Sequence, residues 1–375
     1  MFERVGLEPA VAIVLGDLQH HERPQKGSQD NYPANKPTEH QVFNESSLAD
    51  SNHEKFEPFI FTSWKCSQAP PWLNRLLIQP YIWQTQDMVR RPSDIIYISH
   101  LLVLCLIGLP NLILLFAHFS WIHAVLHELL VLYFLGPYTI IMHHHLHGRG
   151  ILSPRWASID ASFPYILGPL MGQTWNSFYY HHKHHHVEDN GPDDLSSTLR
   201  YQRDSTSDLC IYLARFVLLN WFELPWYYIR KGKPVMGLKY FGWEVLSLGF
   251  IALLVKYNGR AAMAALVLPL IQWRVLVMMN NWGQHTFVDE VEPTSKFRFS
   301  VTLIGAVANR HSLNDGYHTS HHLSPRRHWR DHPFEFIKAW DRYSNQEALI
   351  VQNVNFISLA ILLCRKSTSI LRQNA

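Results

Sequence analysis

Residues 122–147 read IHAVLHELLVLYFLGPYTIIMHHHLH. The run from residue 122 to residue 142 is apolar and long enough to cross a bilayer, which takes about 20 residues. It leads directly into four histidines, of which His143 and His147 stand four positions apart. Residues at that spacing share one face of a helix. The stretch therefore predicts a spanning helix that presents two imidazoles at its end.

Three later places in the chain carry further candidate metal ligands. A second box, HxxHH, fits two registers of one run: His182, His185 and His186, or His181, His184 and His185. A third box, also HxxHH, consists of His318, His321 and His322. Between these boxes, Asn281 and His285 stand four apart after an apolar run. Imidazole suits iron, copper, zinc and nickel, and open positions around non-haem iron allow oxygen chemistry. The pattern predicts one metal site assembled from distant segments.

One further HxxxH, at His123 and His127, is excluded from that site. His127 precedes His143 by 16 residues on the same expected helix, which separates them by roughly 24 Å. The two ends of the helix cannot serve one cluster, so we expect this pair to be structural or interfacial.

Four apolar stretches are expected to cross the membrane as two hairpins: residues 95–119 with 122–142, and 241–257 with 261–281. All boxes can bind one metal centre only if they lie on the same side, which requires an even number of crossings. Residues 208–228 are the weakest candidate because Arg215, Glu223 and Pro225 interrupt them. We therefore interpret residues 208–228 as an interfacial amphipathic helix.

The expected fold class is all-α: an integral membrane protein with four transmembrane helices and a helical cap that carries the histidines. Arg90-Arg91 and the basic run 230–233 flank the same face, which the positive-inside rule makes cytosolic. Residues 1–55 are polar and should be a disordered tail. Residues 56–345 form the expected membrane domain, and residues 346–375 a C-terminal helix and tail that packs on the cytosolic part.

Composition narrows the class of protein further. Hydrophobic residues make up 47% of 375 residues, and the net charge of +3 is too small to argue for nucleic acid. The four cysteines are scattered without a CxxC, which argues against a disulfide scaffold or a zinc ribbon.

The three boxes and their order resemble the membrane fatty-acid desaturase superfamily, a histidine-box group with a non-haem di-iron centre, over about residues 80–340. His147-Gly148 is similar to the HxxxHG of acyl-lipid desaturases, and His321-His322-Leu323-Ser324-Pro325 to their HHLxP ending. Acyl-CoA desaturases instead have HxxxxH in the first box, where this chain has Met142. The 35 residues from His147 to His182 favour the desaturase branch over the related hydroxylases, whose first two boxes lie closer.

The resemblance implies a set of ten residues at the metal centre, nine histidine ligands and one asparagine linked through water. They are His143, His147, His182, His185, His186, Asn281, His285, His318, His321 and His322. It also implies two iron ions (Fe²⁺) as cofactors and O₂ as co-substrate.

The implied activity is that of an oxidoreductase that introduces a double bond into a fatty-acyl or acyl-like chain. The expected partners are a separate cytochrome b5-type electron donor with its reductase, an acyl-chain substrate and membrane lipids, but no nucleic acid. The expected location is the endoplasmic reticulum, with boxes and termini cytosolic. The donor is expected to dock near Arg200, Arg203 and Arg230-Lys231.

Several alternatives stay open. A hydroxylase or acetylenase on the same scaffold could act on a lipid or a specialised metabolite. A histidine-rich metal transporter would need polar ligands deep in the spans, where the candidates are Glu128, Glu244, Gln272 and Arg274. Arg274 either reaches the headgroups or pairs with Glu244. The acidic residues that follow the second box, which either orient ligand histidines or form a solvated loop, are Glu188, Asp189, Asp193 and Asp194.

Overall fold

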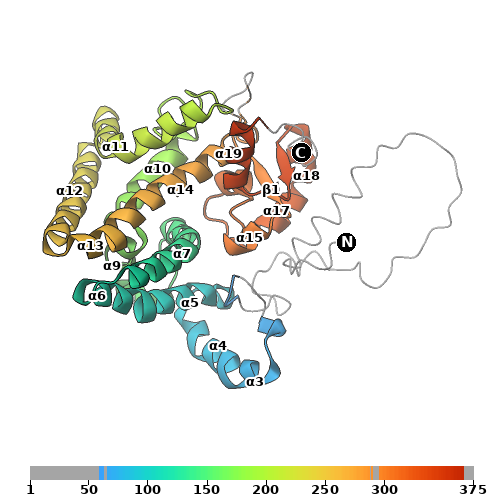
Figure 1. The fold of residues 1–375 in the computed structure, drawn as a ribbon. Helices are drawn as coiled ribbons and strands as arrows, with labels where there is room; N and C mark the ends of the chain where they lie inside the picture. Colours follow the sequence, from blue (N-terminus) through green and yellow to red (C-terminus); the bar gives the residue numbers. More distant parts are fainter. Residues whose placement is uncertain (1–58, 63–65, 288, 290–294, 367–375) are drawn as a thin grey trace, which may run out of the picture.

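Four long apolar helices dominate the structure, a computed structural model that describes residues 59–62, 66–287, 289 and 295–366. The helices long and apolar enough to span a membrane are Ile95–Ala117, Trp121–Gly148, Pro234–Tyr257 and Gly259–Gln284. The predicted four spans in two hairpins are thus confirmed (Figure 1). The predicted tail of residues 1–55 lies outside the described residues.

The first span contains α5 (Ile95–Val103), a π-helical turn (Leu104–Gly108) and α6 (Leu109–Ala117). The fourth span has the same form, with α13 (Gly259–Ala262), a π-helical turn (Met263–Val267) and α14 (Leu268–Gln284). In each span a proline, Pro110 or Pro269, follows the π-turn by two residues. A proline removes one backbone donor and crowds the carbonyl four residues before it, and a widened turn relieves that crowding. The irregular turn of the first span therefore lies just before Pro110.

The two hairpins meet at the end of the spans remote from the histidine boxes. Ser120 caps α7 (Trp121–Gly148) by accepting a hydrogen bond from the His123 amide. Asn258, between α12 (Pro234–Tyr257) and α13, caps α13 and donates from its side-chain amide to the carbonyl of Phe116. This contact ties the second hairpin to the first.

The helix α11 (Thr206–Arg230) packs along α12 and is absent from the four candidate spans of the described chain. Arg215 pairs with Glu223 at 3.0 Å, which compensates both charges that interrupt this segment. One side of α11 is buried and another exposes large apolar side chains, such as Phe222 and Trp226. This amphipathic pattern suits an interfacial helix, and its depth in a membrane stays a prediction.

The histidine-bearing cap is built mainly from short helices. They are α8 (Ala157–Asp160), α9 (Phe163–Ile166), α10 (Ser177–Glu188), α15 (Val307–His311), α16 (His318–Leu323), α17 (His332–Lys338) and α18 (Trp340–Asn345). The strands β1 (Thr302–Ile304) and β2 (Ile350–Gln352) form a parallel pair, a small addition to the expected all-α fold. Helix α19 (Phe356–Cys364) then packs on α14, where a side chain at Gly283 would collide with the backbone of Phe356.

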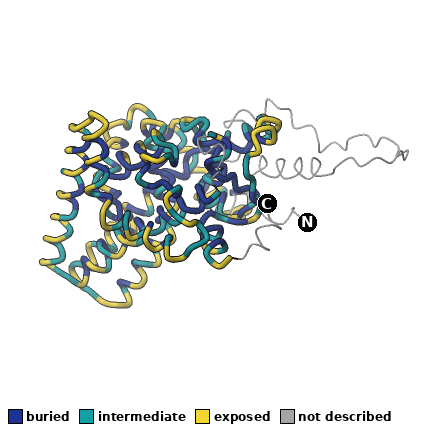
Figure 2. The backbone as a smooth tube through the Cα atoms, turned by 90° about the horizontal axis from the view of Figure 1, so that it is seen from above, coloured by how far each residue is buried: buried dark blue, intermediate teal, exposed yellow. Residues whose placement is uncertain are grey.

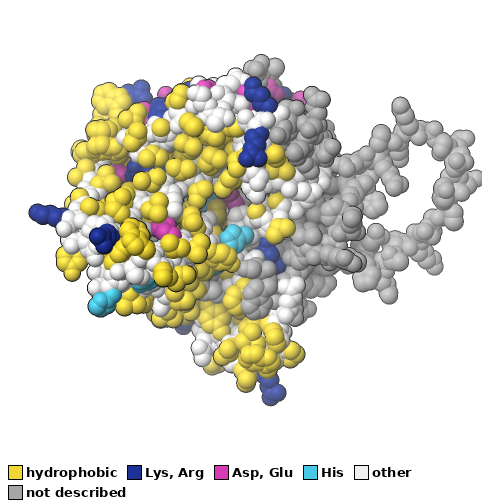
Figure 3. Space-filling view, in the orientation of Figure 1, with side chains coloured by type: hydrophobic (Ala, Val, Ile, Leu, Met, Phe, Trp, Pro, Cys, Tyr) yellow, Lys and Arg dark blue, Asp and Glu magenta, His cyan; other side chains and the backbone are white. Residues whose placement is uncertain are grey.

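Burial is distributed as a membrane protein requires. Figure 2 shows the buried positions concentrated in the cap and the exposed ones along the spanning helices. Hydrophobic side chains cover much of the face drawn in Figure 3. The described residues also include α3 (Pro71–Leu73), a π-helical turn (Asn74–Ile78) and α4 (Gln79–Thr85), which expose apolar side chains and which no sequence pattern had predicted.

Candidate metal centre

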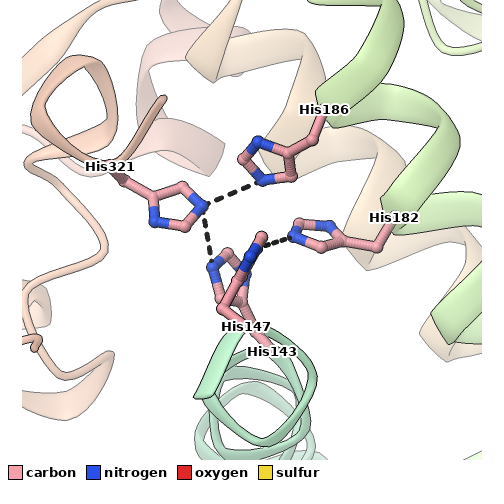
Figure 4. Close-up of side chains that lie close together, drawn as sticks. All are labelled: His143, His147, His182, His186 and His321. Carbon is pink, nitrogen blue, oxygen red and sulfur yellow. Dashed lines mark hydrogen bonds between the residues drawn. The ribbon is translucent and has the colours of Figure 1, made fainter. Parts of the chain in front are cut away.

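Nine histidines from four segments converge into two neighbouring clusters, each able to hold a metal ion. The first cluster consists of His143, His147, His182, His186 and His321 (Figure 4). The second consists of His185, His285, His318 and His322. Within each cluster the ligand atoms lie within 4.8 Å of one another. The structure therefore brings together the nine histidines that the resemblance implied, and leaves out His181 and His184 of the alternative register.

The HxxHH spacing divides each box between the two clusters. On α10, His182 and His186 face the first cluster, and His185 faces the second. On α16 the assignment is reversed, because His318 and His322 face the second cluster and His321 the first. Positions i and i+4 lie above one another on a helix, while position i+3 lies slightly to the side. Each short helix thus serves both clusters.

The nitrogen distances fit shared ions better than a hydrogen-bond network. In the first cluster, Nε2 of His321 lies 2.9 Å from Nε2 of both His143 and His186. In the second, Nε2 of His318 lies 3.3 Å from that of His285 and 3.0 Å from that of His322. A neutral imidazole has only one N–H, so converging nitrogens cannot all satisfy each other. Two nitrogens that each lie about 2.1 Å from one ion, with a nitrogen–ion–nitrogen angle of about 90°, would be about 3 Å apart.

For six of these histidines, burial favours the neutral form of the imidazole that binds metal. Burial, followed by the proximity of the other histidines, holds the pKa well below its usual value for His182, His186, His318, His321 and His322. Burial lowers the pKa of His285 to about 3. A ligand nitrogen must be unprotonated, so the cluster is ready for a cation at neutral pH.

Three histidines of the second cluster are oriented by hydrogen bonds from their Nδ1 atoms. His185 donates to Asp194 at 2.8 Å, and His322 donates to Asp189 at 3.0 Å. His285 donates to the carbonyl of Phe299 at 2.8 Å. Such acceptors fix the tautomer and direct Nε2 toward the metal position. Among the described contacts, no comparable acceptor holds a histidine of the first cluster.

The acidic run after the second box therefore divides into two roles. Asp189 and Asp194 orient ligand histidines, as one of the two interpretations predicted. Glu188 and Asp193 instead contact Lys231, at 3.1 and 2.9 Å, near the surface. Burial alone would raise the pKa of Asp194, but its electrostatic interaction and hydrogen bond with His185, together with the hydrogen bond from Ser196, hold it far below its usual value. Asp194 is thus an anion in the interior.

Asn281 lies beside the second cluster without being one of the clustered ligand groups. Its side-chain nitrogen donates to the carbonyl of Ser196 at 2.9 Å and to the hydroxyl of Tyr212 at 2.7 Å. It also lines a cavity of about 60 Å³ together with His185 and His318. The cavity is large enough to hold water near Asn281. Ser196 and Tyr212 had no signal in the sequence, because their roles arise only from packing.

The remaining histidines lie outside the clusters. In the second box, His181 packs against Phe216, and His184 accepts a hydrogen bond from the amide of Leu195, so the structure favours the register that starts at His182. In the first box, His144 and His145 point elsewhere: His144 bonds the hydroxyl of Tyr97, and His145 the carbonyl of Asp160.

Several polar residues of the spans also have protein partners, although the Glu128 carboxylate has no hydrogen-bond partner among the described residues. His123 and His127 both contact Asn111 at the far end of α7, which agrees with a structural pair. Arg274 pairs with Glu244 at 2.7 Å, one of its two predicted arrangements. A charge pair satisfied in this way is not a free ligand set for a transported metal.

Comparison with known proteins matches residues 119–349 to the family described as fatty acid desaturase. The matched region contains all nine clustered histidines. No curated protein and no solved structure matches the chain.

Proposed function

The chain belongs to the fatty acid desaturase family of oxidoreductases, and on that premise we propose that it is a di-iron desaturase acting on a fatty-acyl or acyl-like chain. The observation that carries this proposal is the convergence of nine buried or nearly buried histidines into two adjacent clusters. Each cluster would hold one Fe²⁺ ion. An all-imidazole ligand set suits iron and leaves positions for oxygen.

The proposed reaction balances only with an external reductant. Conversion of a CH₂–CH₂ unit and O₂ into an alkene and two waters consumes two electrons and two protons. When bound, the iron pair would supply the redox chemistry that oxidises an unactivated C–H bond. A separate cytochrome b5-type protein, with its reductase, is the proposed electron donor.

The residues of the chain prepare the site for this chemistry. Burial lowers the pKa of most cap imidazoles, such as His318, and Asp194 and Asp189 hold His185 and His322 in one tautomer. On this proposal the four long apolar helices would exclude water from the bound acyl chain. Asn281, fixed by its two hydrogen bonds, is proposed to hold a water beside the second cluster.

The proposed location is the endoplasmic reticulum membrane, with the cap in the cytosol. The basic residues near the cap support this orientation through the positive-inside rule. The proposed donor surface contains Arg200 and Lys231, which contact the segment 188–194 beside the second cluster. An acidic partner docked there would lie close to the second metal position. Membrane lipids surround the spans in this arrangement.

The test is expression in a yeast host, which supplies its own cytochrome b5 system, followed by lipid and metabolite profiling. We expect a new alkene-containing product that disappears, with loss of bound iron, in His182→Gln and His318→Gln. The matched control is His144→Gln, which changes a histidine beside a ligand of the first box that bonds Tyr97 outside both clusters, and which should keep both iron and product. Full iron content in both ligand variants would contradict the di-iron site, and a hydroxylated product without an alkene would contradict desaturation.

A further inference from the structure

An open cavity of about 570 Å³ leads from the surface of the cap to the first histidine cluster. Its walls come from the end of α7, from α9 and α10, and from the segment after α16. His147 and His186 line it, and they are the two partly exposed members of the otherwise buried clusters. A volume in this range is typical of a small-molecule site. We call this space the entrance cavity.

The charged residues of the entrance cavity all have the same sign. Arg149, Lys183 and Arg326 line it, and all three are exposed. Among the described residues that line the cavity there is no Asp or Glu. Apolar side chains, including Leu146 and Val187, form part of the same walls. Exposed cations beside an apolar wall suit an amphiphile with an anionic head and an apolar tail.

Phe178 separates the entrance cavity from a second space, the inner cavity of about 60 Å³, and lines both. Its ring lies 5.2 Å from that of His182 and 5.8 Å from that of Trp273, measured between centroids. Trp273 is itself fixed, because its indole nitrogen donates to Thr139 at 3.1 Å. The inner cavity touches histidines of both clusters, and it is too small for an acyl chain while Phe178 occupies this position.

We propose that the entrance cavity binds a single acyl chain with an anionic head group, and that Phe178 is the partition which the tail displaces to reach the inner cavity. The head contacts Arg149, Lys183 and Arg326, and the tail passes Phe178 toward α14. There Val277 and Met278 continue the wall of the inner cavity. This inference rests on the proposed function and names the chemistry of its substrate.

The first test measures binding to the metal-free full chain in detergent, so it does not depend on turnover. The probes are radiolabelled hexadecyl phosphate and hexadecanol, which share a tail and differ in charge. We expect the phosphate to bind about tenfold or more tightly, as charge-assisted hydrogen bonds allow. The triple variant Arg149→Gln/Lys183→Gln/Arg326→Gln should abolish that preference.

The matched control is Arg155→Gln/Lys233→Gln/Arg260→Gln, which removes three exposed cations that do not line the cavity. It should keep the preference for the phosphate. Equal affinity for both probes in the wild type, or an unchanged preference in the cavity variant, would overturn the proposal. Displacement of the bound phosphate by palmitoyl-coenzyme A or by palmitoyl lysophosphatidate supports it and identifies the carrier, whereas displacement by neither overturns it.

The second test locates the tail with hexadecyl phosphate that carries a photoreactive diazirine at mid-chain. We expect labelling of the α14 peptide that contains Val277 and Met278. Phe178→Trp enlarges the partition and should move the label to the walls near Leu146 and Val187, while Phe178→Leu should keep labelling on α14. Absence of α14 labelling in the wild type would overturn the role of Phe178. Because neither test requires iron or product, failure of the desaturase assignment would be seen separately.

Discussion

Replacement of Asp194 by asparagine should weaken the second metal site more than the first. Asp194 is fully buried, and each of its carboxylate oxygens accepts two hydrogen bonds. Oδ2 accepts from His185 Nδ1 at 2.8 Å and from the amide of Asn190 at 3.0 Å. Oδ1 accepts from the amide of Ser196 at 2.8 Å and from its hydroxyl at 2.6 Å. Either orientation of an asparagine side chain therefore directs its NH₂ group at a backbone N–H.

The expected magnitude follows from these contacts. At least one buried N–H loses its acceptor, which costs about 1–3 kcal/mol, and the bond from His185 loses the assistance of a charge. Loss of the carboxylate that orients a metal-binding histidine typically lowers metal affinity by about 10–100-fold, or about 1.4–2.8 kcal/mol. We expect Asp194→Asn to fall in that range at the second site.

The assay is a chelator titration of anaerobically Fe²⁺-loaded protein, with iron per chain measured by mass spectrometry. Asp194→Asn should release one of two irons at a roughly 10–100-fold lower chelator concentration than the wild type does. The control is Asp193→Asn, because Asp193 is half exposed and contacts Lys231 rather than a histidine. Thermal unfolding of each variant verifies that it is folded. Retention of both irons by folded Asp194→Asn at the wild-type chelator concentration would refute the role given to Asp194.

Three further predictions concern the scaffold. Burial would raise the pKa of Asp94, but contacts with neighbouring groups hold this pKa below its usual value. The largest of these contacts are the electrostatic interaction and the hydrogen bond with His328. The ionised form therefore stabilises the fold above about pH 3.9, and this stabilisation is lost as the pH falls below that value. Asp94→Asn should lower the free energy of unfolding by about 1.5–3 kcal/mol at pH 7. Chemical denaturation should show that this difference in stability from the wild type becomes smaller in acid. Arg274→Met should lower the free energy of unfolding by about 3–5 kcal/mol, because it removes the partner of the buried Glu244 carboxylate. The double variant Arg274→Met/Glu244→Gln should recover part of that loss. Equal stability of the single and the double variant would contradict this prediction. Gly283→Ala should cost about 1–3 kcal/mol by forcing α19 away from α14, which differential scanning fluorimetry would detect as a lower midpoint.

The spans and the histidine boxes could be predicted because their signals are local. Apolar length marks a spanning helix, and HxxxH or HxxHH marks a helical face that carries ligands. The exact ends were less accessible, since the third span begins at Pro234 rather than at residue 241. The second span does continue through the first box, because α7 runs to Gly148. The first two ligands therefore sit within the spanning helix itself, one turn apart.

Other features could not be predicted because they depend on tertiary packing. The run 181–186 contains two HxxHH patterns, and only the packing of His181 against Phe216 and of His184 against Tyr227 turns the other three histidines toward the clusters. Likewise, four acidic residues follow the second box, and their positions in space decide which of them reach a histidine. The pairing of β1 with β2 joins segments 46 or more residues apart, for which neither strand alone gives a signal.

The exchange of histidines between α10 and α16 makes the two metal positions interdependent. Each of these helices gives two ligands to one cluster and one to the other, so neither cluster is complete without both helices. The i+3 histidines, His185 and His321, are the crossing ligands. A displacement of α10 that moves His182 and His186 from the first cluster must also move His185 from the second. Because His185 is held by Asp194, the carboxylate that orients the second cluster also restrains the helix that supplies the first.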